Sequence, residues 1–235
     1  KELVEEALAA IVVEYEDLPG VYTMEEAIAP GAPLLHEEYP GNIFKPSVFP
    51  LRKGDVEEGF AKADYIIERE YTTQFVEHSY IEPEAAVAYE NPNDGVMTVH
   101  ASAQNPFFSR HYIADALGVG LNEVRLIQEH IGGSFGGKEE GLGVLIGRTA
   151  YLAKLTHRPV KMVFSREDSF LESPKRHPFH FRYKAGVTKD GKIIAWEGTQ
   201  MDNSGAYNNQ TLFMNWRASV HSAGCYEIDN IKTDT

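Results

Sequence analysis

A glycine-rich segment, His-Ile-Gly-Gly-Ser-Phe-Gly-Gly-Lys-Glu-Glu-Gly at residues 130–141, constrains the fold of this chain more than any other stretch. A strand-like run at 123–129 precedes it, and residues 139–155 predict a helix after it. Glycine allows backbone conformations that other residues avoid, so several amide N–H groups of such a loop can converge on one anion. The N-terminus of the following helix adds a partial positive charge. The sequence therefore predicts an anion-binding loop between a strand and a helix.

The sequence around this loop predicts both hairpins and helices. Two strand-like runs, 85–90 and 96–102, flank Asn-Pro-Asn-Asp-Gly and indicate a hairpin, and residues 179–202 indicate a longer hairpin that turns at Lys-Asp-Gly. Pro106 can open a helix that Gly118 ends, and residues 160–165 predict a further strand. We therefore expect an α+β (mixed α/β) fold of hairpin-rich sheets with packed helices.

The N-terminal part of the chain has weaker signals. Residues 2–10 and 23–29 have helical composition, and the apolar run at 11–16 predicts a strand. Residues 30–50 are rich in proline and glycine and predict an irregular linker. Beyond it we expect a short helix at 56–63 and a half-buried strand at 64–74.

Composition excludes several classes of function. Acidic residues outnumber basic ones by 35 to 22, for a net charge of -13, which argues against a sequence-independent nucleic-acid binder. A single cysteine, Cys225, cannot hold an iron–sulfur cluster or a zinc ion by itself. No apolar run is long enough to cross a bilayer. These features favour a protein of the reducing cytoplasm that binds neither nucleic acid nor membrane.

Short motifs within the loop allow competing interpretations. Gly132-x-x-x-x-Gly137-Lys138 matches a P-loop up to its last position, where Glu139 replaces the hydroxyl residue that would bind magnesium. Gly132-x-Ser134-x-Gly136 has the spelling of a nucleophile elbow, which keeps a serine hydrolase using Ser134 as an alternative. A glycine turn that only lets a helix and a strand pack closely is the plain structural alternative.

Longer stretches, in this order, carry a family resemblance: 77–89, 101–119, 124–140 and 176–195. They closely resemble the molybdenum-binding large subunit of the xanthine dehydrogenase/aldehyde oxidase family, and specifically its xanthine dehydrogenase-like members. Residues 13–27 resemble the end of the hammerhead domain that precedes it in the family. The resemblance implies a fragment in which residues 1–50 are the tail of a hammerhead-like domain and a linker. Residues 51–235 would then be an incomplete first molybdenum cofactor-binding domain.

The resemblance also implies a cofactor and partners. Members of the family use a molybdopterin, in some cases as a dinucleotide, to hydroxylate an electron-poor carbon with oxygen from water. A base deprotonates a metal-bound hydroxide, and electrons leave through [2Fe-2S] clusters and FAD. With one cysteine, this chain would depend on iron–sulfur and FAD domains or subunits, and on the remainder of the large subunit.

The resemblance assigns site residues at the glycine loop. Gly133, Ser134, Phe135 and Gly136 would bind the cofactor, with the Phe135 amide facing an oxo ligand of the molybdenum. Family members commonly have glycine where this chain has Ser134, a departure that an ordinary backbone conformation would tolerate.

Two charged residues would bind the substrate. Glu139 matches the carboxylate that holds a purine in the family, and Arg217 matches the arginine across the ring. Such a pair can exchange hydrogen bonds with a heterocycle and stabilise charge on it, which favours a small purine or related N-heterocycle over an aldehyde. Without the resemblance, Glu139 reads as a first-turn acid of the predicted helix and Arg217 as a surface cation.

Departures from the family pattern limit what the chain can do. The family often places a glutamine two residues before the histidine of the Glu77-His78 pair, where this chain has Val76, and Gln74 is the nearest substitute. The family's catalytic glutamate lies beyond the matched region, so this chain contains no catalytic residue under this interpretation. We expect the fragment alone to be inactive. A cofactor-free scaffold subunit is the alternative that is not an enzyme.

Overall fold

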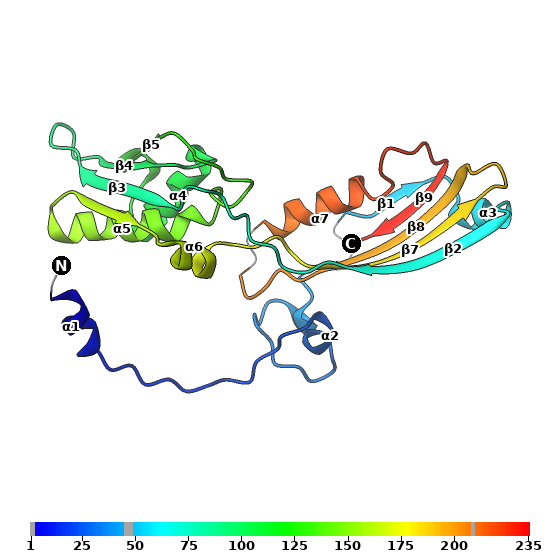
Figure 1. Cartoon of the computed structure of the whole chain (residues 1–235), viewed down its shortest axis with the longest axis horizontal. Helices are drawn as coiled ribbons and strands as arrows, with labels where there is room; N and C mark the ends of the chain where they lie inside the picture. The colour runs from blue at the N-terminus through cyan, green and yellow to red at the C-terminus, as the bar shows by residue number, and fades with distance from the viewer. Residues whose placement is uncertain (1–2, 45–48, 208–209) are drawn as a thin grey trace. The chain divides into compact units, whose positions relative to one another are not determined.

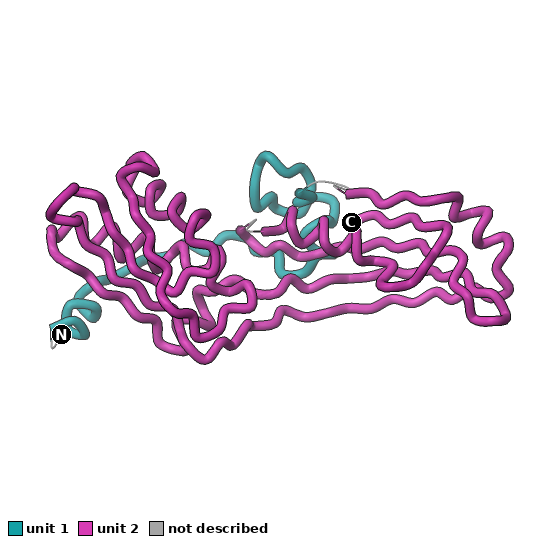
Figure 2. The backbone as a smooth tube through the Cα atoms, turned by 90° about the horizontal axis from the view of Figure 1, so that it is seen from above, with its two compact units in different colours: residues 1–46 teal, residues 47–235 magenta. Residues whose placement is uncertain are grey.

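The computed structural model describes residues 3–44, 49–207 and 210–235, and it forms two compact units, residues 1–46 and 47–235 (Figure 1, Figure 2). The first unit contains α1 (Val4–Ala9), α2 (Met24–Ala27) and the 3₁₀ turn η1 (Pro40–Asn42). The Thr23 hydroxyl accepts a hydrogen bond from the Glu26 amide, which starts α2 with a capping box. Both predicted N-terminal helices are confirmed in shortened form.

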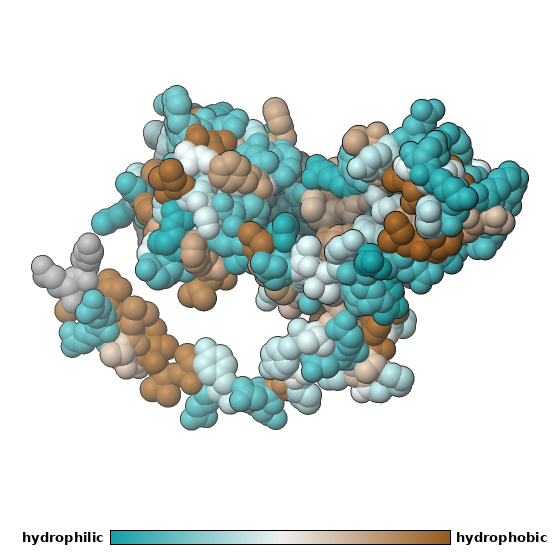
Figure 3. Space-filling view, turned by 45° about the vertical axis from the view of Figure 1, so that its right-hand side comes forward, coloured by the Kyte–Doolittle hydropathy of each residue, from teal (hydrophilic) through white to brown (hydrophobic). Residues whose placement is uncertain are grey.

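The strand predicted at residues 11–16 is wrong. This segment is irregular, and the side chains of Ile11, Val12 and Tyr15 are 64%, 82% and 85% exposed. Apolar side chains lie uncovered along this segment in Figure 3. A strand needs a hydrogen-bonded neighbour, and among the described strands none pairs with it. The predicted linker at 30–50 is irregular where it is described, and residues 45–48 lie outside the described chain. Assignment of residues 1–50 to a hammerhead-like domain stays a prediction.

The four-stranded sheet of the second unit carries the predicted glycine loop. Its order is β5-β4-β3-β6, with β3 (Ala85–Glu90), β4 (Met97–Ala101), β5 (Val124–Gln128) and β6 (Val160–Val163). The β3–β4 hairpin is confirmed, and β5 pairs parallel to β4. A parallel neighbour needs a crossover, which α4 (Pro106–Leu117) and the 3₁₀ turn η2 (Leu121–Glu123) supply.

The ends of α4 are as the sequence predicts. The Asn105 side chain accepts from the Phe108 amide at the first turn, Pro106 occupies the first helical position, and Gly118 ends the helix at a φ of 64°. Helix α5 (Leu142–Thr156) packs against α4 and against this sheet. The core between them is apolar, and its fully buried members include Val99, Ile113, Leu145 and Ile146.

The five-stranded sheet has the order β1-β9-β8-β7-β2. Its strands are β1 (Leu51–Lys53), β2 (Tyr65–Thr72), β7 (Phe179–Val187), β8 (Ile193–Asp202) and β9 (Asn230–Asp234). The predicted long hairpin is confirmed as β7 and β8, and the predicted helix at 56–63 is confirmed as α3 (Val56–Ala61). Helices α6 (Arg166–Glu172) and α7 (Thr211–Val220) were not expected from the sequence.

Two further expectations need correction. The helix predicted from residue 139 begins only at Leu142, because residues 132–141 turn repeatedly before the first helical residue. Strand β2, expected to be half-buried, is exposed along its whole length. It is the edge strand of its sheet, so only β7 pairs with it. Among the described residues, no helix is long and apolar enough to cross a membrane.

The core position of Leu145 gives a test of this architecture. Leu145→Ala removes a side chain with 0% exposure, and we expect the free energy of unfolding to fall by about 2–5 kcal/mol because a cavity remains. Leu155→Ala is the matched control on the same helix, since Leu155 is 65% exposed. Chemical denaturation measures both changes, and equal losses would contradict the packing of α5 described above.

Candidate cofactor-binding site

The glycine loop leaves β5 and turns back on itself before α5. Three of its residues have positive φ angles: Gly133 at 99°, Phe135 at 54° and Gly136 at 101°. A bulky residue such as Phe135 is rarely left-handed, and this conformation costs on the order of 1–3 kcal/mol. Ser134, by contrast, is absent from the residues with positive φ, so its replacement of the family glycine needs no unusual backbone. Strain at Phe135 marks the tip of this loop as a functional candidate.

The segment 78–82 holds the two ends of the loop. The Gly132 amide donates to Glu82 Oε2 over 2.6 Å, and the Glu82 amide donates to the Gly132 carbonyl over 3.2 Å. A Cβ on Gly132 would lie 2.5 Å from Glu82 Cβ, and one on Gly137 would lie 2.5 Å from Tyr80 Cε1. Glycine is therefore needed at both ends by close packing rather than by backbone conformation.

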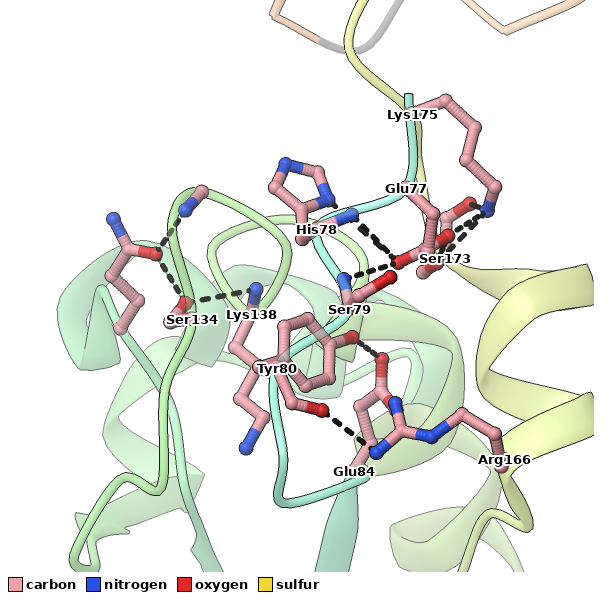
Figure 4. A network of polar contacts seen from close by, with 12 residues as sticks. Glu77, His78, Ser79, Tyr80, Glu84, Ser134, Lys138, Arg166, Ser173 and Lys175 are labelled. Carbon is pink, nitrogen blue, oxygen red and sulfur yellow. Dashed lines mark hydrogen bonds and ion pairs between the residues drawn. The ribbon is translucent and has the colours of Figure 1, made fainter. Parts of the chain in front are cut away.

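Ser134 is a structural anchor of the loop. Its hydroxyl donates to Gln104 Oε1 and accepts from the Lys138 amide over 3.1 Å (Figure 4). The side chain is 8% exposed, and α5 begins eight residues later rather than at once. Among the described contacts, no histidine reaches this hydroxyl. The serine hydrolase alternative therefore has no support, because an elbow serine must be exposed and activated by a base.

Gln104 is the site residue that the sequence did not reveal. Its Oε1 atom accepts from both the Ser134 hydroxyl and the Gly136 amide, the second over 2.9 Å, and its backbone amide donates to the Lys138 carbonyl over 3.0 Å. Gln104 lies in the segment after β4, 30 residues from Ser134. Only the parallel pairing of β4 with β5 brings the two segments together.

Whether Gln74 serves in place of the family glutamine, whose position Val76 occupies, or that contact is absent stays untested. The Val76 carbonyl accepts from the Arg176 amide over 2.9 Å, and the Gln74 carbonyl accepts from the Arg176 side chain. These bonds place both residues in the connection between the sheets. The glutamine that contacts the loop in this structure is Gln104.

The tip of the loop offers unused donors. None of the described intramolecular hydrogen bonds uses the Phe135 amide, and the Phe135 ring is 75% exposed. The neighbouring donors Gly136 N and Lys138 N are already taken by Gln104 and Ser134. An anion or an electron-rich oxygen at the tip would therefore meet the Phe135 amide, as the sequence predicts for a cofactor-binding loop.

Lys138 points into the protein. Its side chain is 0% exposed, its Nζ lies 2.7 Å from Glu82 Oε2, and it lies over the Tyr80 ring at 4.8 Å. Partial burial raises the pKa of Glu82, but hydrogen bonds from Lys138 and Gly132 outweigh that effect and bring it below its ordinary value. A lysine held in this way cannot reach a bound phosphate, so the P-loop interpretation fails here too.

Several buried or half-buried polar groups hold the segment 78–82 in place. The Tyr80 hydroxyl donates to Glu84, and burial raises the Tyr80 pKa further above its ordinary value (Figure 4). Arg166 Nη2 donates to the carbonyls of Tyr80 and Ile81 over 2.7 and 2.8 Å. The His78 ring packs beside Gly136 and Gly137, and burial lowers its pKa. These contacts fix the surface on which the loop lies.

Glu139 and Arg217 lie on different elements. Glu139 is half-buried in the turn before α5, outside its first helical turn, which corrects the interpretation of Glu139 as a helix-dipole acid. Arg217 is exposed on α7 with its guanidinium over the Phe213 ring at 5.4 Å. The described contacts include no direct bond between the two residues. Glu140 hydrogen-bonds to Gln210, the residue at the N-terminal boundary of α7, so the end of the loop lies beside the start of that helix.

Fold and loop together define an α+β domain whose glycine loop leaves the Phe135 amide without a partner among the described hydrogen bonds. Residues 35–235 match the family described as "Molybdopterin cofactor-binding domain". This match covers more than half of the chain, which therefore belongs to that family. The molybdopterin that this family implies fits the residues present. Phe135 has a left-handed backbone conformation, and its amide has no partner among the described hydrogen bonds. Within the described residues, no cluster of three His, Cys, Asp or Glu side chains could hold a metal directly.

Curated relatives extend well beyond this chain. This chain is 41% identical over 233 residues to the nicotinate dehydrogenase large molybdopterin subunit of Eubacterium barkeri. The matched region covers 99% of this chain and 53% of that protein. The chain is 34% identical over 230 residues to the xanthine dehydrogenase of Blastobotrys adeninivorans, covering 98% of this chain and 16% of that protein. The chain thus spans about half of the first relative and a much smaller share of the second.

A solved structure confirms the predicted fold class. The aldehyde oxidoreductase of Desulfovibrio gigas superimposes with a TM-score of 0.88 at 26% identity, covering 98% of this chain and 25% of that one. The mixed sheets and packed helices described above are therefore shared with that protein, as expected for a molybdopterin cofactor-binding domain.

Glu140 provides a test of the electrostatics at this site. Burial and then the charge of Glu139 raise its pKa above the ordinary value of 4.5. The folded state consequently binds this proton more tightly than the unfolded state, so stability is lost as pH rises through the folded pKa. We expect Glu140→Gln, which can keep the bond to Gln210, to raise the melting temperature above pH 7.

The pH dependence separates this effect from general stabilisation. At about pH 4 the wild-type side chain of Glu140 is mostly protonated and therefore neutral, like the glutamine of the variant. The melting temperatures of wild type and Glu140→Gln should therefore converge. Glu227→Gln, at an exposed position between α7 and β9, is the control and should change neither value. A constant gain at every pH would contradict a raised pKa at Glu140.

Proposed function

We propose that the full-length protein is a molybdenum hydroxylase that oxidises a purine or related N-heterocycle with oxygen from water. This chain would supply one wall of its cofactor site. The observation that carries the proposal is the left-handed Phe135 with its unused amide, held in place by Gln104. Membership of the molybdopterin cofactor-binding family supports the same interpretation.

The residues of the loop would divide the work of binding. Gly133 and Gly136 give the turn its shape, Ser134 ties it to Gln104, and Phe135 presents its amide to an oxygen of the cofactor. When bound, molybdopterin supplies a molybdenum centre that takes up the two electrons of the oxidation. Because the Phe135 amide is fixed before binding, it stabilises charge without reorganising. The loop also keeps water from one side of the reacting centre.

Glu139 and Arg217 would bind the substrate ring. A carboxyl group can hydrogen-bond ring nitrogens, and a guanidinium can stabilise a negative charge on a ring substituent or carbonyl oxygen. The two relatives named above are a nicotinate dehydrogenase and a xanthine dehydrogenase, both named for N-heterocycles. A pyridine carboxylate is therefore the related heterocycle to test beside a purine.

Electron transfer would depend on partners. With Cys225 as its single cysteine, this chain cannot hold a [2Fe-2S] cluster, so we assign the clusters and FAD to other domains or subunits in the cytoplasm. The general-base glutamate of the family would come from the remainder of the large subunit. The fragment alone should therefore be inactive.

Metal analysis tests the cofactor. The full-length protein, purified after expression with its partners and a molybdenum supply, should contain molybdenum and release a pterin on acid oxidation. Plasma mass spectrometry and pterin fluorescence measure the two. Finding neither would favour the scaffold alternative and overturn the proposal.

The substrate class has a test of its own. In the full-length enzyme, Glu139→Val combined with Arg217→Met should lower kcat/KM for xanthine or nicotinate by roughly 10²–10⁴-fold, because charged hydrogen bonds contribute about 1.5–3 kcal/mol each and two are lost. Turnover of an aromatic aldehyde should change far less. Glu167→Val, at an exposed position, is the control. Equal losses of kcat/KM for the heterocycle and the aldehyde would show that Glu139 and Arg217 do not bind the heterocycle specifically.

A further inference from the structure

One ion pair near the loop has no part in the function proposed above. Lys138 is fully buried, while the Glu82 side chain that it pairs with is 38% exposed. A buried ammonium ion is costly, and a hydrophobic side chain of similar volume would often be as stable or more stable there. A charged lysine at this position therefore calls for an explanation other than stability alone.

The Glu82 carboxylate joins the two ends of the loop. Its Oε2 atom accepts from the Gly132 amide over 2.6 Å and from Lys138 Nζ over 2.7 Å. Gly132 is the residue at which the loop begins, and Lys138 is the residue at which it ends. One oxygen thus fixes the width of the loop at its base. A second bond, from the Glu82 amide to the Gly132 carbonyl over 3.2 Å, prevents rotation of that end.

The tip of the loop between these two ends is held by Gln104 and by hydrogen bonds within the loop. Gln104 Oε1 accepts hydrogen bonds from the Ser134 hydroxyl and the Gly136 amide. No described intramolecular hydrogen bond uses the Phe135 amide. The left-handed Phe135 is unfavourable by itself, so it persists only while the surrounding contacts enforce it. Widening the base would let Phe135 relax toward an ordinary conformation and turn its amide away.

We propose that Glu82 and Lys138 are positioning residues that close the base of the loop and thereby hold the Phe135 amide in its cofactor-binding conformation. This inference rests on the proposed function for what the amide binds. The pair also fixes the chain at Lys138 with its side chain inward, and Glu139 follows directly in the sequence. The two residues act through Phe135 and Glu139 and touch neither cofactor nor substrate themselves.

Charge-neutralising variants of the full-length enzyme with its partners test the proposal. Lys138→Met and Glu82→Gln each leave one charge without its partner, whereas the combined variant Glu82→Gln, Lys138→Met leaves none. Arg148→Met, Glu172→Gln is the matched control, because it removes a 3.0 Å ion pair between α5 and α6 away from the loop. Three measurements are made on each: melting temperature, amide hydrogen exchange of residues 132–139, and molybdenum retained after dialysis.

The combined variant decides the outcome. We expect its melting temperature to recover toward that of the wild type, because no unpaired charge remains buried. Exchange at 132–139 should stay faster by about 10-fold or more, and molybdenum retention should stay lower by on the order of 10–100-fold, as for other supporting residues of metal sites. Recovery of all three measurements would show a purely structural pair and overturn the proposal. Unchanged exchange in the combined variant would overturn it as well.

The two proposals can fail separately. A wild-type enzyme without molybdenum would refute the proposed function, yet hydrogen exchange would still report whether the pair sets the loop. If a single variant does not fold, the combined variant and the control remain, and both lack a buried unpaired charge. A retained cofactor with fast exchange at 132–139 would refute the link between loop closure and binding.

Discussion

The close approach of the glycine loop to the segment 78–82 is the contact on which the candidate site depends. Gly132 and Gly137 lie against Glu82 and Tyr80 at distances that a Cβ would reduce to 2.5 Å. At this separation, backbone amides and the Glu82 carboxylate hydrogen-bond directly. The loop is therefore built from main-chain groups at fixed positions, which under the proposed function would bind an anion without first having to be ordered.

Strain at the tip and order at the base belong together. A left-handed Phe135 would not persist in a free loop, since the cost of this conformation is comparable to that of breaking a hydrogen bond. Gln104 and the Glu82–Lys138 pair supply the opposing contacts from two different segments. Because those segments come from the sheet and its connections, the core of α4, α5 and the four-stranded sheet indirectly sets the orientation of one amide.

Local signals in the sequence were sufficient for elements with local causes. The hairpin at Asn-Pro-Asn-Asp-Gly and the ends of α4 at Pro106 and Gly118 follow from turn and helix-end chemistry within a few residues. The glycine loop was predicted as an anion-binding turn on the same basis. The strand at 11–16 failed because pairing is a non-local property, and Gln104 escaped notice because its partners are 30 residues away. Composition cannot show which glutamine a parallel strand pairing brings to a loop.

The position that breaks the P-loop pattern also explains the charge of the site. An anion-binding loop bordered by Glu82, Glu139 and Glu140 would repel its ligand unless the acids were neutralised from within. Lys138 does this for Glu82 through its buried ammonium group, whereas burial and the charge of Glu139 raise the pKa of Glu140. Glu139 is then the acid of the three without such compensation. An inward lysine followed by a carboxylate does not suit a triphosphate, but under the proposed function it would let Glu139 hydrogen-bond a heterocycle beside a cofactor that the Phe135 amide would bind.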